Sequence, residues 1–558
     1  MFTTRPELTG TFGMVASTHW LASQAGMAAL EAGGNAFDAA VAAGLVLQVV
    51  EPHMNGPLGE VPIIGHAAAT GETFVVDGQG PAPAGATIDH FAGLGLDLVP
   101  GTGLLPACVP GAFGAWLALL QAHGTMRFGD VASYAIGYAD GGYPLPTGAR
   151  DTIATVADLF RTEWTDSAAV YLPGGAVPVA GSRFRNPALA AMYRRLVDAG
   201  EAAGRDRDAQ IDGVRAAFYD GFVAETIASY LDKAEALDSS GRRHKGVLAH
   251  GDLAGHRTRF EQPVTFEYHG YTVCKPGPWS QGPVFLQQLA LLAGFDLADL
   301  PTDSPEFAHL VVECAKLAFA DREAFYGDPR SVDVPLAALL GDDYNAARRA
   351  LVGERASAEL RPGSPGGRPP RLPALPQWRA AAAGTGEPTV ARDGRTRGDT
   401  CHLDVVDRWG NLVSATPSGA WLSVRRPGSC SPAGRSPASF LCVSTRRRRH
   451  RRTGPTRSVP AVASRHPHRP RRSPILASPG RVSVTERTED HPHAAPAHTS
   501  ARSGRAHLCR ARPAPTRRRG TPVGARRARR GPGGEHRDRA GLGSPDRDDD
   551  REPRHPSE

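Results

Sequence analysis

Apolar residues between positions 20 and 50 recur at the spacing of two α-helices. The first helix is predicted to run from Trp20 to the pair at Gly33 and Gly34, with Ser17 or Thr18 as its N-cap. The second follows Asn35, a favourable N-cap residue, and is closed by Pro52. The apolar positions are Trp20, Leu21, Ala25, Ala28 and Ala29 in the first helix, and Phe37, Val41, Leu45 and Val49 in the second. Asp38, Glu51 and His53 are candidates for a polar network beside them.

Two further helices are predicted later in the chain. One extends from about Pro305 through Phe319 with apolar residues at helical spacing, and Asp321 and Arg322 are expected as a surface ion pair at its end. The other covers 284–292 and follows a loop rich in Gly and Pro at 277–282.

Short β-prone runs complete the pattern. Residues 74–76 predict a strand, followed by a loop over 77–83. Two more runs, 403–405 and 412–414, flank residues 408–411, which contain the Gly and Asn that a tight hairpin turn needs. Helices and strands together predict an α+β fold.

Thr400 stands where the first strand of this hairpin begins. Pro, Gly and Arg dominate residues 360–398, which predicts an exposed linker directly before it. The ordinary interpretation of Thr400 is a β-branched residue that starts a strand. The linker favours another interpretation, a nucleophile exposed when the Asp399–Thr400 bond is cut.

Composition changes sharply near Ser423. Residues 424–558 contain 32 Arg, no Lys and 11 acidic residues, and Phe440 is their single aromatic residue. The overall charge of +7 is therefore the sum of +21 in this tail and −14 in residues 1–423. Such a tail cannot bury enough apolar surface to offset its chain entropy, so it is predicted not to form a core.

Three interpretations of the tail stay open. Its Arg clusters are typical of a basic arm that binds nucleic acid, although it has no aromatic platform for bases. A natural disordered extension is the second. The third, which we favour, is translation in the wrong reading frame of a GC-rich gene.

The rest of the composition indicates a large protein without a disulfide framework. Seven scattered cysteines predict neither paired disulfides nor a zinc site, and no other metal site is expected. No apolar stretch is long enough to span a membrane, and residues 1–13 carry no signal-peptide pattern, so we expect a cytoplasmic location and no membrane partner.

Motifs over about 420 residues resemble those of the gamma-glutamyltranspeptidase family of N-terminal nucleophile hydrolases. The small subunit of that family begins with Thr-x-His, an apolar strand, Asp, a Gly-Asn turn and a second strand, as do residues 400–414 here. The upstream matches are Val15-Ala16-Ser17 before His19, Gly33 to Ala40, Glu51-Pro52, Val109-Pro110-Gly111, Pro276 to Gly282, Ala318 to Arg322, and Gly327-Asp328-Pro329.

The resemblance implies a four-layer αββα sandwich and a chain in three parts. Residues 1–399 correspond to the large subunit, 400–423 to the start of the small subunit, and 424–558 to the tail, so the sandwich is incomplete after about residue 423. It also implies self-cleavage at Asp399–Thr400 and an acyl-Thr400 intermediate. Water or an amino-acid or peptide amine would accept the γ-glutamyl or other acyl group of a small amide substrate, without metal or organic cofactor.

Two substrate-binding positions depart from the family pattern. Gln79 stands where the family has an Arg that holds the α-carboxylate of the glutamyl group, and Gly80 stands in place of a Glu. Ser418 keeps the hydroxyl of the family's Thr, and Ala420 replaces an Asn. These changes favour another acyl group or a divergent way of holding it. Because the family's downstream oxyanion motifs do not follow Ser423, the chain as written is expected to be impaired. The alternative function is nucleic-acid binding through the tail, which we do not favour.

Overall fold

The computed structural model describes residues 8–372 and 400–419 of the 558-residue chain. All of them belong to one structural unit, Met1–Thr453. Asp399, Ala420, the greater part of the expected linker and the whole Arg-rich tail lie outside the described residues, as do Cys430, Cys442 and Cys509.

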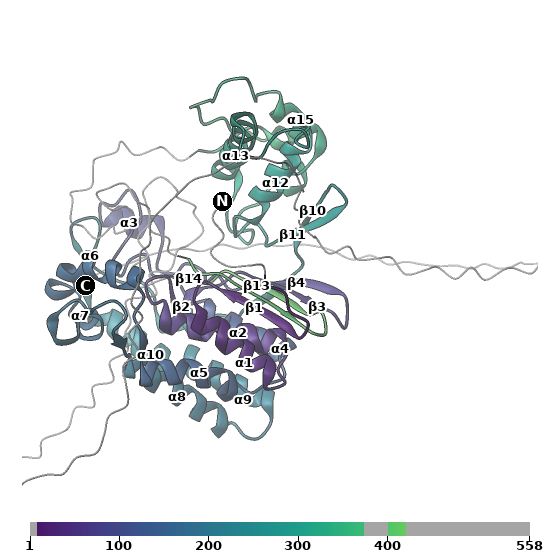
Figure 1. Ribbon diagram of the computed structural model, residues 1–558. Coiled ribbons are helices and arrows are strands. Elements are labelled where there is room, and N and C mark those ends of the chain that lie inside the picture. The colour runs from purple at the N-terminus through teal and green to yellow at the C-terminus, as the bar shows by residue number, and fades with distance from the viewer. Residues whose placement is uncertain (1–7, 373–399, 420–558) are drawn as a thin grey trace, which may run out of the picture. The chain divides into compact units, whose positions relative to one another are not determined.

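A six-stranded antiparallel sheet brings the two ends of the described chain together (Figure 1). The hairpin predicted around 408–411 is confirmed, and Gly410 turns it with a φ of 89°. Its first strand pairs with the strand nearest the N-terminus, Val405 opposite Val15. In spatial order the strands are β1 (Gly13–Ser17), β12 (Leu403–Asp407), β13 (Leu412–Ala415), β3 (Ile63–Ala67), β4 (Glu72–Asp77) and β9 (Arg259–Glu261).

Two helices cover one face of this sheet, α1 (Trp20–Glu31) and α2 (Ala36–Val50). Asn35 caps α2 as predicted, and Asp38 completes a capping box. The N-cap of α1 is His19, so the prediction of Ser17 or Thr18 is wrong. Ser17 ends β1 instead, while the hydroxyl of Thr18 donates to Glu51 across 2.5 Å.

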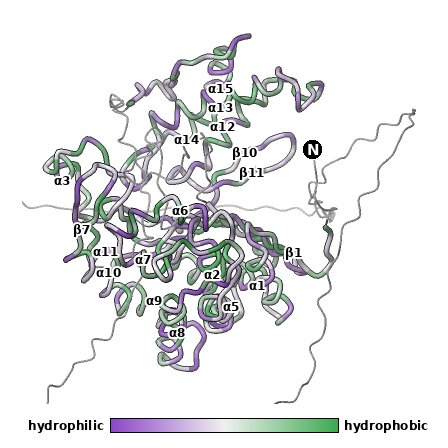
Figure 2. The backbone as a smooth tube through the Cα atoms, turned by 60° about the vertical axis from the view of Figure 1, so that its left-hand side comes forward, coloured by the Kyte–Doolittle hydropathy of each residue, from purple (hydrophilic) through white to green (hydrophobic). Residues whose placement is uncertain are grey.

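All 15 residues of α2 are buried, because it packs between the sheet and α5. Its small residues permit close approach: a Cβ added at Gly44 would lie 2.5 Å from the ring of Trp116. Figure 2 shows this helix as one of the most hydrophobic parts of the chain. Alternate residues of β12, Leu403, Val405 and Asp407, point toward this core.

The opposite face of the sheet exposes apolar side chains. Met14, Val406 and Leu412 are 37%, 41% and 43% exposed, and their positions in register place them side by side on that face. In the expected four-layer fold a second sheet covers this face. Beside the six-stranded sheet, the described residues form pairs of strands, among them β2 (Asn55–Glu60) with β14 (Ser418–Gly419).

The middle of the chain is mainly helical and extends the core beyond α2. Its elements are α3 (Ile88–Gly93), α4 (Ala112–His123), α5 (Phe128–Gly141), β5 (Tyr143–Pro144), α6 (Thr147–Thr162), α7 (Thr165–Tyr171), η1 (Pro173–Gly175), β6 (Arg183–Phe184), α8 (Pro187–Ala202), α9 (Arg207–Tyr219), α10 (Phe222–Lys233), β7 (Glu235–Leu237), β8 (Arg243–Lys245) and α11 (His250–Ala254).

A second apolar cluster forms among the helices that follow. The helices predicted at 284–292 and from 305 are confirmed, although the latter continues to Phe325. The elements are β10 (Val264–Tyr268), β11 (Tyr271–Lys275), α12 (Gly282–Leu292), α13 (Pro305–Phe325), α14 (Leu336–Leu339), α15 (Asp342–Arg349) and η2 (Pro365–Gly367).

The surface ion pair expected at Asp321 and Arg322 is wrong. Both residues lie inside α13 and are buried, and Asp321 pairs with Arg348 across 3.2 Å. Asp321 also accepts the backbone N–H of Gly363 across 2.7 Å. The first residues of the expected linker are therefore bound to α13, and residues 373–399 lie outside the described residues.

Within residues 8–372 and 400–419, no helix is both long and apolar enough to cross a membrane. Cys108, Cys274, Cys314 and Cys401 are free thiols, as the scattered cysteines predict, and all except Cys274 are buried.

Candidate active site

The candidate residues lie together at one edge of the six-stranded sheet, where the ends of four neighbouring strands meet. Because neighbouring strands are antiparallel, the start of β12, the end of β13, the start of β3 and the end of β4 all meet at this edge. Thr400 precedes β12, Ser418 follows β13, Glu60 precedes β3 and Gln79 follows β4. Residues from distant parts of the sequence thus converge beside Thr400.

Thr400 contacts Ser418 directly. Their backbones form an isolated antiparallel bridge, and their hydroxyl oxygens lie 3.4 Å apart. The regular strand begins three residues later, at Leu403. The next backbone N–H, of Cys401, donates to the carbonyl of Pro417 across 2.9 Å. Thr400 is partly buried, with its hydroxyl beside a second hydroxyl.

Ser418 is held by a close approach of two backbones. It pairs with Glu60 in the β2–β14 sheet, and the register shifts at Gly419, which has a φ of 90°. A Cβ at Gly59 would lie 2.1 Å from the carbonyl oxygen of Ser418. Glycine is therefore required at position 59 for this pairing.

Gln79, which follows β4, contacts Glu60, the residue that pairs with Ser418. Its Nε2 donates to Oε2 of Glu60 across 2.8 Å, and its backbone N–H donates to Asp77 Oδ1 across 3.2 Å. The structure thus connects all three sequence-predicted residues that it describes, Thr400, Ser418 and Gln79, through Glu60. Sequence reasoning missed Glu60; the pairing of β2 with β14 is what places it there.

The loop that carries Gln79 packs against the Val109-Pro110-Gly111 turn. A Cβ at Gly80 would lie 1.5 Å from the carbonyl oxygen of Val109, and one at Gly111 would lie 2.2 Å from that of Gly78. The N–H of Val109 also donates to the Pro81 carbonyl across 3.0 Å. In this chain there is no room for the family's larger residue at position 80.

Asp77 lies under this loop in a charged neighbourhood. Its pKa is raised to about 6, chiefly by burial and in part by nearby Glu261, against the lowering effects of the Gln79 N–H, Arg330 and Arg259. Asp77 and Arg259 are opposite each other in the β4–β9 pair.

Behind Thr400 a buried polar cluster surrounds Cys401. Its Sγ lies 3.1 Å from Oε2 of Glu51 and 3.2 Å from Nδ2 of Asn55, and the same Glu51 oxygen accepts the Thr18 hydroxyl. Burial and the Glu51 carboxylate raise the pKa of Cys401 well above its usual range. Glu51 is thus a network member, as the sequence suggested, and Asp38 is another, accepting two N–H groups after α4.

His402 lies at the surface next to this cluster. Its Nδ1 is 2.9 Å from Oγ1 of Thr416, and its Nε2 is 3.1 Å from a carboxylate oxygen of Asp404. Its carbonyl accepts the N–H of Thr18 across 3.1 Å. The Thr-x-His motif therefore fixes the strand start through both backbone and side chain.

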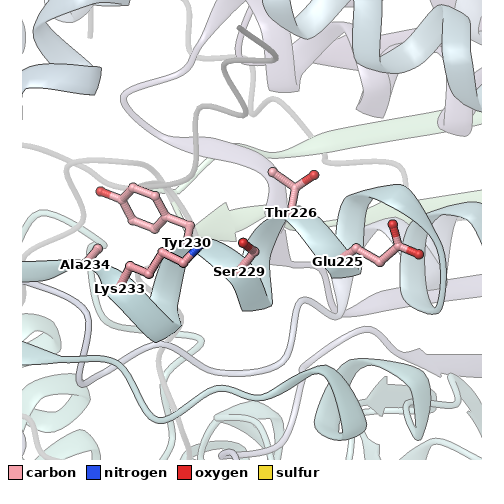
Figure 3. A pocket seen from close by; sticks show the side chains of 6 residues that line it. All are labelled: Glu225, Thr226, Ser229, Tyr230, Lys233 and Ala234. Carbon is pink, nitrogen blue, oxygen red and sulfur yellow. The ribbon is translucent and has the colours of Figure 1, made fainter. Parts of the chain in front are cut away.

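Two other features of the described residues were compared with this site, possible metal ligands and a hollow on the surface. Among the described residues, no group of three or more His, Cys, Asp or Glu side chains is arranged to hold a metal ion. An open hollow of about 540 Å³ lies along α10 and shares no residue with the sheet edge (Figure 3). Its lining consists of Glu225, Thr226, Ser229, Tyr230, Lys233 and Ala234.

Known proteins are similar to this chain in sequence and in fold. The chain is 34% identical to the glutathione hydrolase-like YwrD proenzyme of Bacillus subtilis strain 168, over 63% of this chain and 62% of the relative. It is 32% identical to the acylase ACY 1 proenzyme of Pseudomonas sp. strain V22, over 73% of this chain and 65% of the relative. It thus spans less than two thirds of the length of these two relatives.

A solved structure of LmbA2991HD is 55% identical, with a TM-score of 0.70 over 78% of this chain and 72% of that one. A crystal structure of Helicobacter pylori gamma-glutamyltranspeptidase is 27% identical, with a TM-score of 0.56 over 64% of this chain and 97% of that one. The likeness to solved structures of this kind confirms the expected α+β fold of N-terminal nucleophile hydrolases. Because the family model described as gamma-glutamyltranspeptidase matches residues 22–423, the chain belongs to the gamma-glutamyltranspeptidase family.

Proposed function

We propose that this sequence encodes a gamma-glutamyltranspeptidase-like enzyme that cuts itself between Asp399 and Thr400 and then transfers or hydrolyses an acyl group. The observation that carries the proposal is the position of Thr400, at the sheet edge with its hydroxyl 3.4 Å from that of Ser418. The proenzyme names of the relatives support self-cleavage.

In the first step the Thr400 hydroxyl attacks the carbonyl carbon of residue 399, and its proton passes to the released α-amine of Thr400. Water then hydrolyses the ester, leaving a carboxylate on residue 399 and a free hydroxyl on Thr400. The new α-amine, with an unperturbed pKa of about 7.7 to 8.0, serves as base for its own hydroxyl.

In the second step the same hydroxyl attacks an amide substrate and releases its amine. Water resolves the acyl-Thr400 ester as hydrolysis, and an amino-acid or peptide amine resolves it as transfer. Ser418 and Gln79 are proposed to bind the substrate, since both are connected to Thr400 at one edge. The acylase name of one relative supports an acyl group other than γ-glutamyl. The reaction is proposed to proceed without metal or organic cofactor.

We also propose that the chain as written is impaired, because residues 424–558 carry no match to the family's downstream motifs. The domain division at residues 399, 423 and 558 and a cytoplasmic location stay predictions.

The first test is to sequence the gene across the codons of Ala415 to Arg435. If another frame restores the family's motifs, the restored chain should split before Thr400 on a denaturing gel, and its Thr400→Ala variant should stay whole. An uncut restored chain contradicts the self-cleaving enzyme. For the chain as written we expect little splitting, and a clear cut into residues 1–399 and 400–558 would contradict the proposed impairment.

The alternative function, nucleic-acid binding, depends on the tail with its charge of +21. It predicts DNA binding that weakens steeply with salt and disappears on truncation after Ser423. Salt-insensitive or absent binding by the full chain removes this alternative.

A further inference from the structure

Cys401, the residue after the proposed nucleophile, has polar partners although it is fully buried. A buried free cysteine usually packs as a small apolar residue. Here Sγ lies 3.1 Å from Oε2 of Glu51 and 3.2 Å from Nδ2 of Asn55. Burial and the Glu51 carboxylate raise the pKa of the thiol, so the sulfur keeps its hydrogen. It donates that hydrogen to Glu51 and accepts one from Asn55.

The residues from Thr400 to His402 join the proposed cleavage site to the regular strand, which begins at Leu403. Side chains alternate along an extended chain, and of these three residues Cys401 is the buried one. Thr400 is partly buried, and His402 is exposed. Because Cys401 and Thr400 share a planar peptide bond, a shift of Cys401 also moves Thr400.

Both partners of the thiol are fixed to their surroundings. Glu51, the C-cap of α2, also accepts the hydroxyl of Thr18, whose N–H donates to the His402 carbonyl across 3.1 Å. Asn55 begins β2, and its Nδ2 also donates to the carbonyl of Leu47 across 2.9 Å. The thiol is thus bound between the end of the central helix and the strand that follows it.

Asn55 connects the thiol with the residue that faces the nucleophile. In the β2–β14 pair Asn55 stands opposite Gly419, the residue after Ser418. Ser418 forms the backbone bridge with Thr400, and the two hydroxyl oxygens are 3.4 Å apart. The side chain of Asn55 therefore links Cys401 to the strand that carries Ser418, which fixes the two hydroxyl-bearing residues relative to each other.

We propose that Cys401 is a positioning residue: its thiol, bound between Glu51 and Asn55, holds the start of β12 where the Thr400 hydroxyl reaches the carbonyl of residue 399. This role rests on the proposed self-cleavage at Thr400. The thiol contacts no reacting atom and acts through the backbone that it shares with Thr400.

Two substitutions distinguish a hydrogen-bonding thiol from one that only packs. Cys401→Ser keeps a donor and an acceptor at this position, whereas Cys401→Ala removes both. If hydrogen bonds position the backbone, the Ser variant should resemble the parent and the Ala variant should not. If the thiol only packs, the Ala variant should be tolerated at least as well, because an unpaired buried hydroxyl is costly.

Cys314 provides the matched control. It is also fully buried, but it lies in the second apolar cluster. A buried hydroxyl is unfavourable in apolar surroundings, so Cys314→Ala should be the milder change there and Cys314→Ser the more harmful one. The order of the two substitutions is therefore expected to be opposite at the two cysteines.

The first measurement needs no cleavage and uses the full-length chain as written. Hydrogen exchange of the Cys401 amide, which donates to the Pro417 carbonyl across 2.9 Å, is followed by mass spectrometry at single-residue resolution and expressed as protection relative to an unstructured chain. We expect Cys401→Ala to lower this protection about tenfold and Cys401→Ser to change it by less than about threefold. Protection of the Ala190 amide, in α8, should stay unchanged in both variants.

The second measurement follows splitting before Thr400 in the restored chain on a denaturing gel. Cys401→Ala should split about tenfold or more slowly than the parent, because a misplaced nucleophile loses rate steeply. Cys401→Ser should split within about threefold of the parent's rate. Both Cys314 variants should split at the parent's rate, since that cluster does not contact Thr400.

Four results overturn the proposal. The Cys401 amide is as protected in Cys401→Ala as in the parent, or it is less protected in Cys401→Ser than in Cys401→Ala. Ala190 loses protection equally, which shows a general loss of structure, or Cys401→Ala splits as fast as the parent. A restored parent chain that stays whole contradicts the proposed function instead, and the exchange result still decides whether the thiol holds this backbone.

Discussion

Glu51 and Cys401 meet in the interior directly behind Thr400, where the thiol lies 3.1 Å from the carboxylate oxygen Oε2. Glu51 closes α2, and Cys401 is the residue after the nucleophile, so this contact joins the end of the central helix to the proposed new N-terminus. The same oxygen accepts the hydroxyl of Thr18. The Glu51 carboxylate thus links the end of α2 to Thr18, which follows β1, and to Cys401, which follows Thr400.

Glu51→Ala should therefore lower the free energy of unfolding by about 1 to 3 kcal/mol, because the buried Cys401 thiol and the Thr18 hydroxyl lose their acceptor. Urea unfolding followed by circular dichroism measures the change. Glu31→Ala, at the exposed end of α1, is the control and should change stability by less than about 0.5 kcal/mol. A Glu51→Ala chain as stable as this control would show that the contact is dispensable.

Asp407 makes a second long-range connection, from the hairpin to the start of α2. Its Oδ2 accepts the N–H of Ala36 across 2.9 Å and the side-chain amide of Asn411 across 2.8 Å. Its Oδ1 accepts the N–H groups of Trp409 and Asn411 across 2.9 and 3.0 Å. The carboxylate also lies at the N-terminus of α2, where the helix dipole favours negative charge.

We expect Asp407→Ala to cost about 3 kcal/mol or more, since four donors lose a charged acceptor. Asp404→Ala, on the exposed face of the same strand, should cost less than about 1 kcal/mol because its partner His402 is also exposed. Both values come from chemical denaturation. Similar losses in the two variants would contradict a special role for Asp407.

Local patterns were sufficient to predict α1, α2, α12, α13 and the hairpin. The Asn35 cap and the Gly410 turn depend on neighbouring residues, so sequence alone reveals them. The α1 cap was missed because Thr18 finds its partner 33 residues away, in Glu51. Tertiary contacts of this kind determine which residue caps a helix, and the residues next to the cap do not reveal them.

In the candidate site too, local motifs could be predicted from the sequence and long-range pairing could not. Thr400, Ser418 and Gln79 were predicted as site residues from motif positions, whereas Glu60 was not considered, because its place beside Ser418 depends on the pairing of β2 with β14. Asp321 was misjudged for a related reason. A charged residue near the expected end of a helix looks solvent-exposed until Arg348 and Gly363, from distant segments, are seen to bury it.

Gly80 offers a test of the loop that presents Gln79. A Cβ there would lie 1.5 Å from the Val109 carbonyl oxygen, so Gly80→Ala must displace one of the two backbones. We expect a loss of about 2 kcal/mol or more in stability, because the loop that carries Gln79 must move away from Val109. Urea unfolding followed by circular dichroism measures this loss.

Gly137→Ala is the matched control for this variant. Gly137 lies on the exposed side of α5 with no atom within 4 Å of an added Cβ, so Ala should stabilise the helix by about 0.5 to 1 kcal/mol. If Gly80→Ala also stabilises the protein, the close approach to Val109 is wrong.

Asp77 should make stability fall as pH rises through the window between about 4 and 6. Its folded-state pKa, raised chiefly by burial to about 6, lies above its ordinary value of 3.8, so the folded chain binds more protons than the unfolded chain in this window. The contribution of Asp77 to stability is thus present below about pH 4 and mostly lost by about pH 6, on the order of 3 kcal/mol. Asp77→Asn removes it, and subtracting the variant's free energy of unfolding from the parent's cancels the other titrating groups. That difference should decline between pH 4 and 6, whereas Asp97→Asn, in an exposed loop, should give a difference that does not change with pH.

A free-energy difference for Asp77→Asn that rises with pH would contradict this prediction. It would mean that the Asp77 carboxylate is stabilised in the fold, with Arg259 and Arg330 outweighing burial.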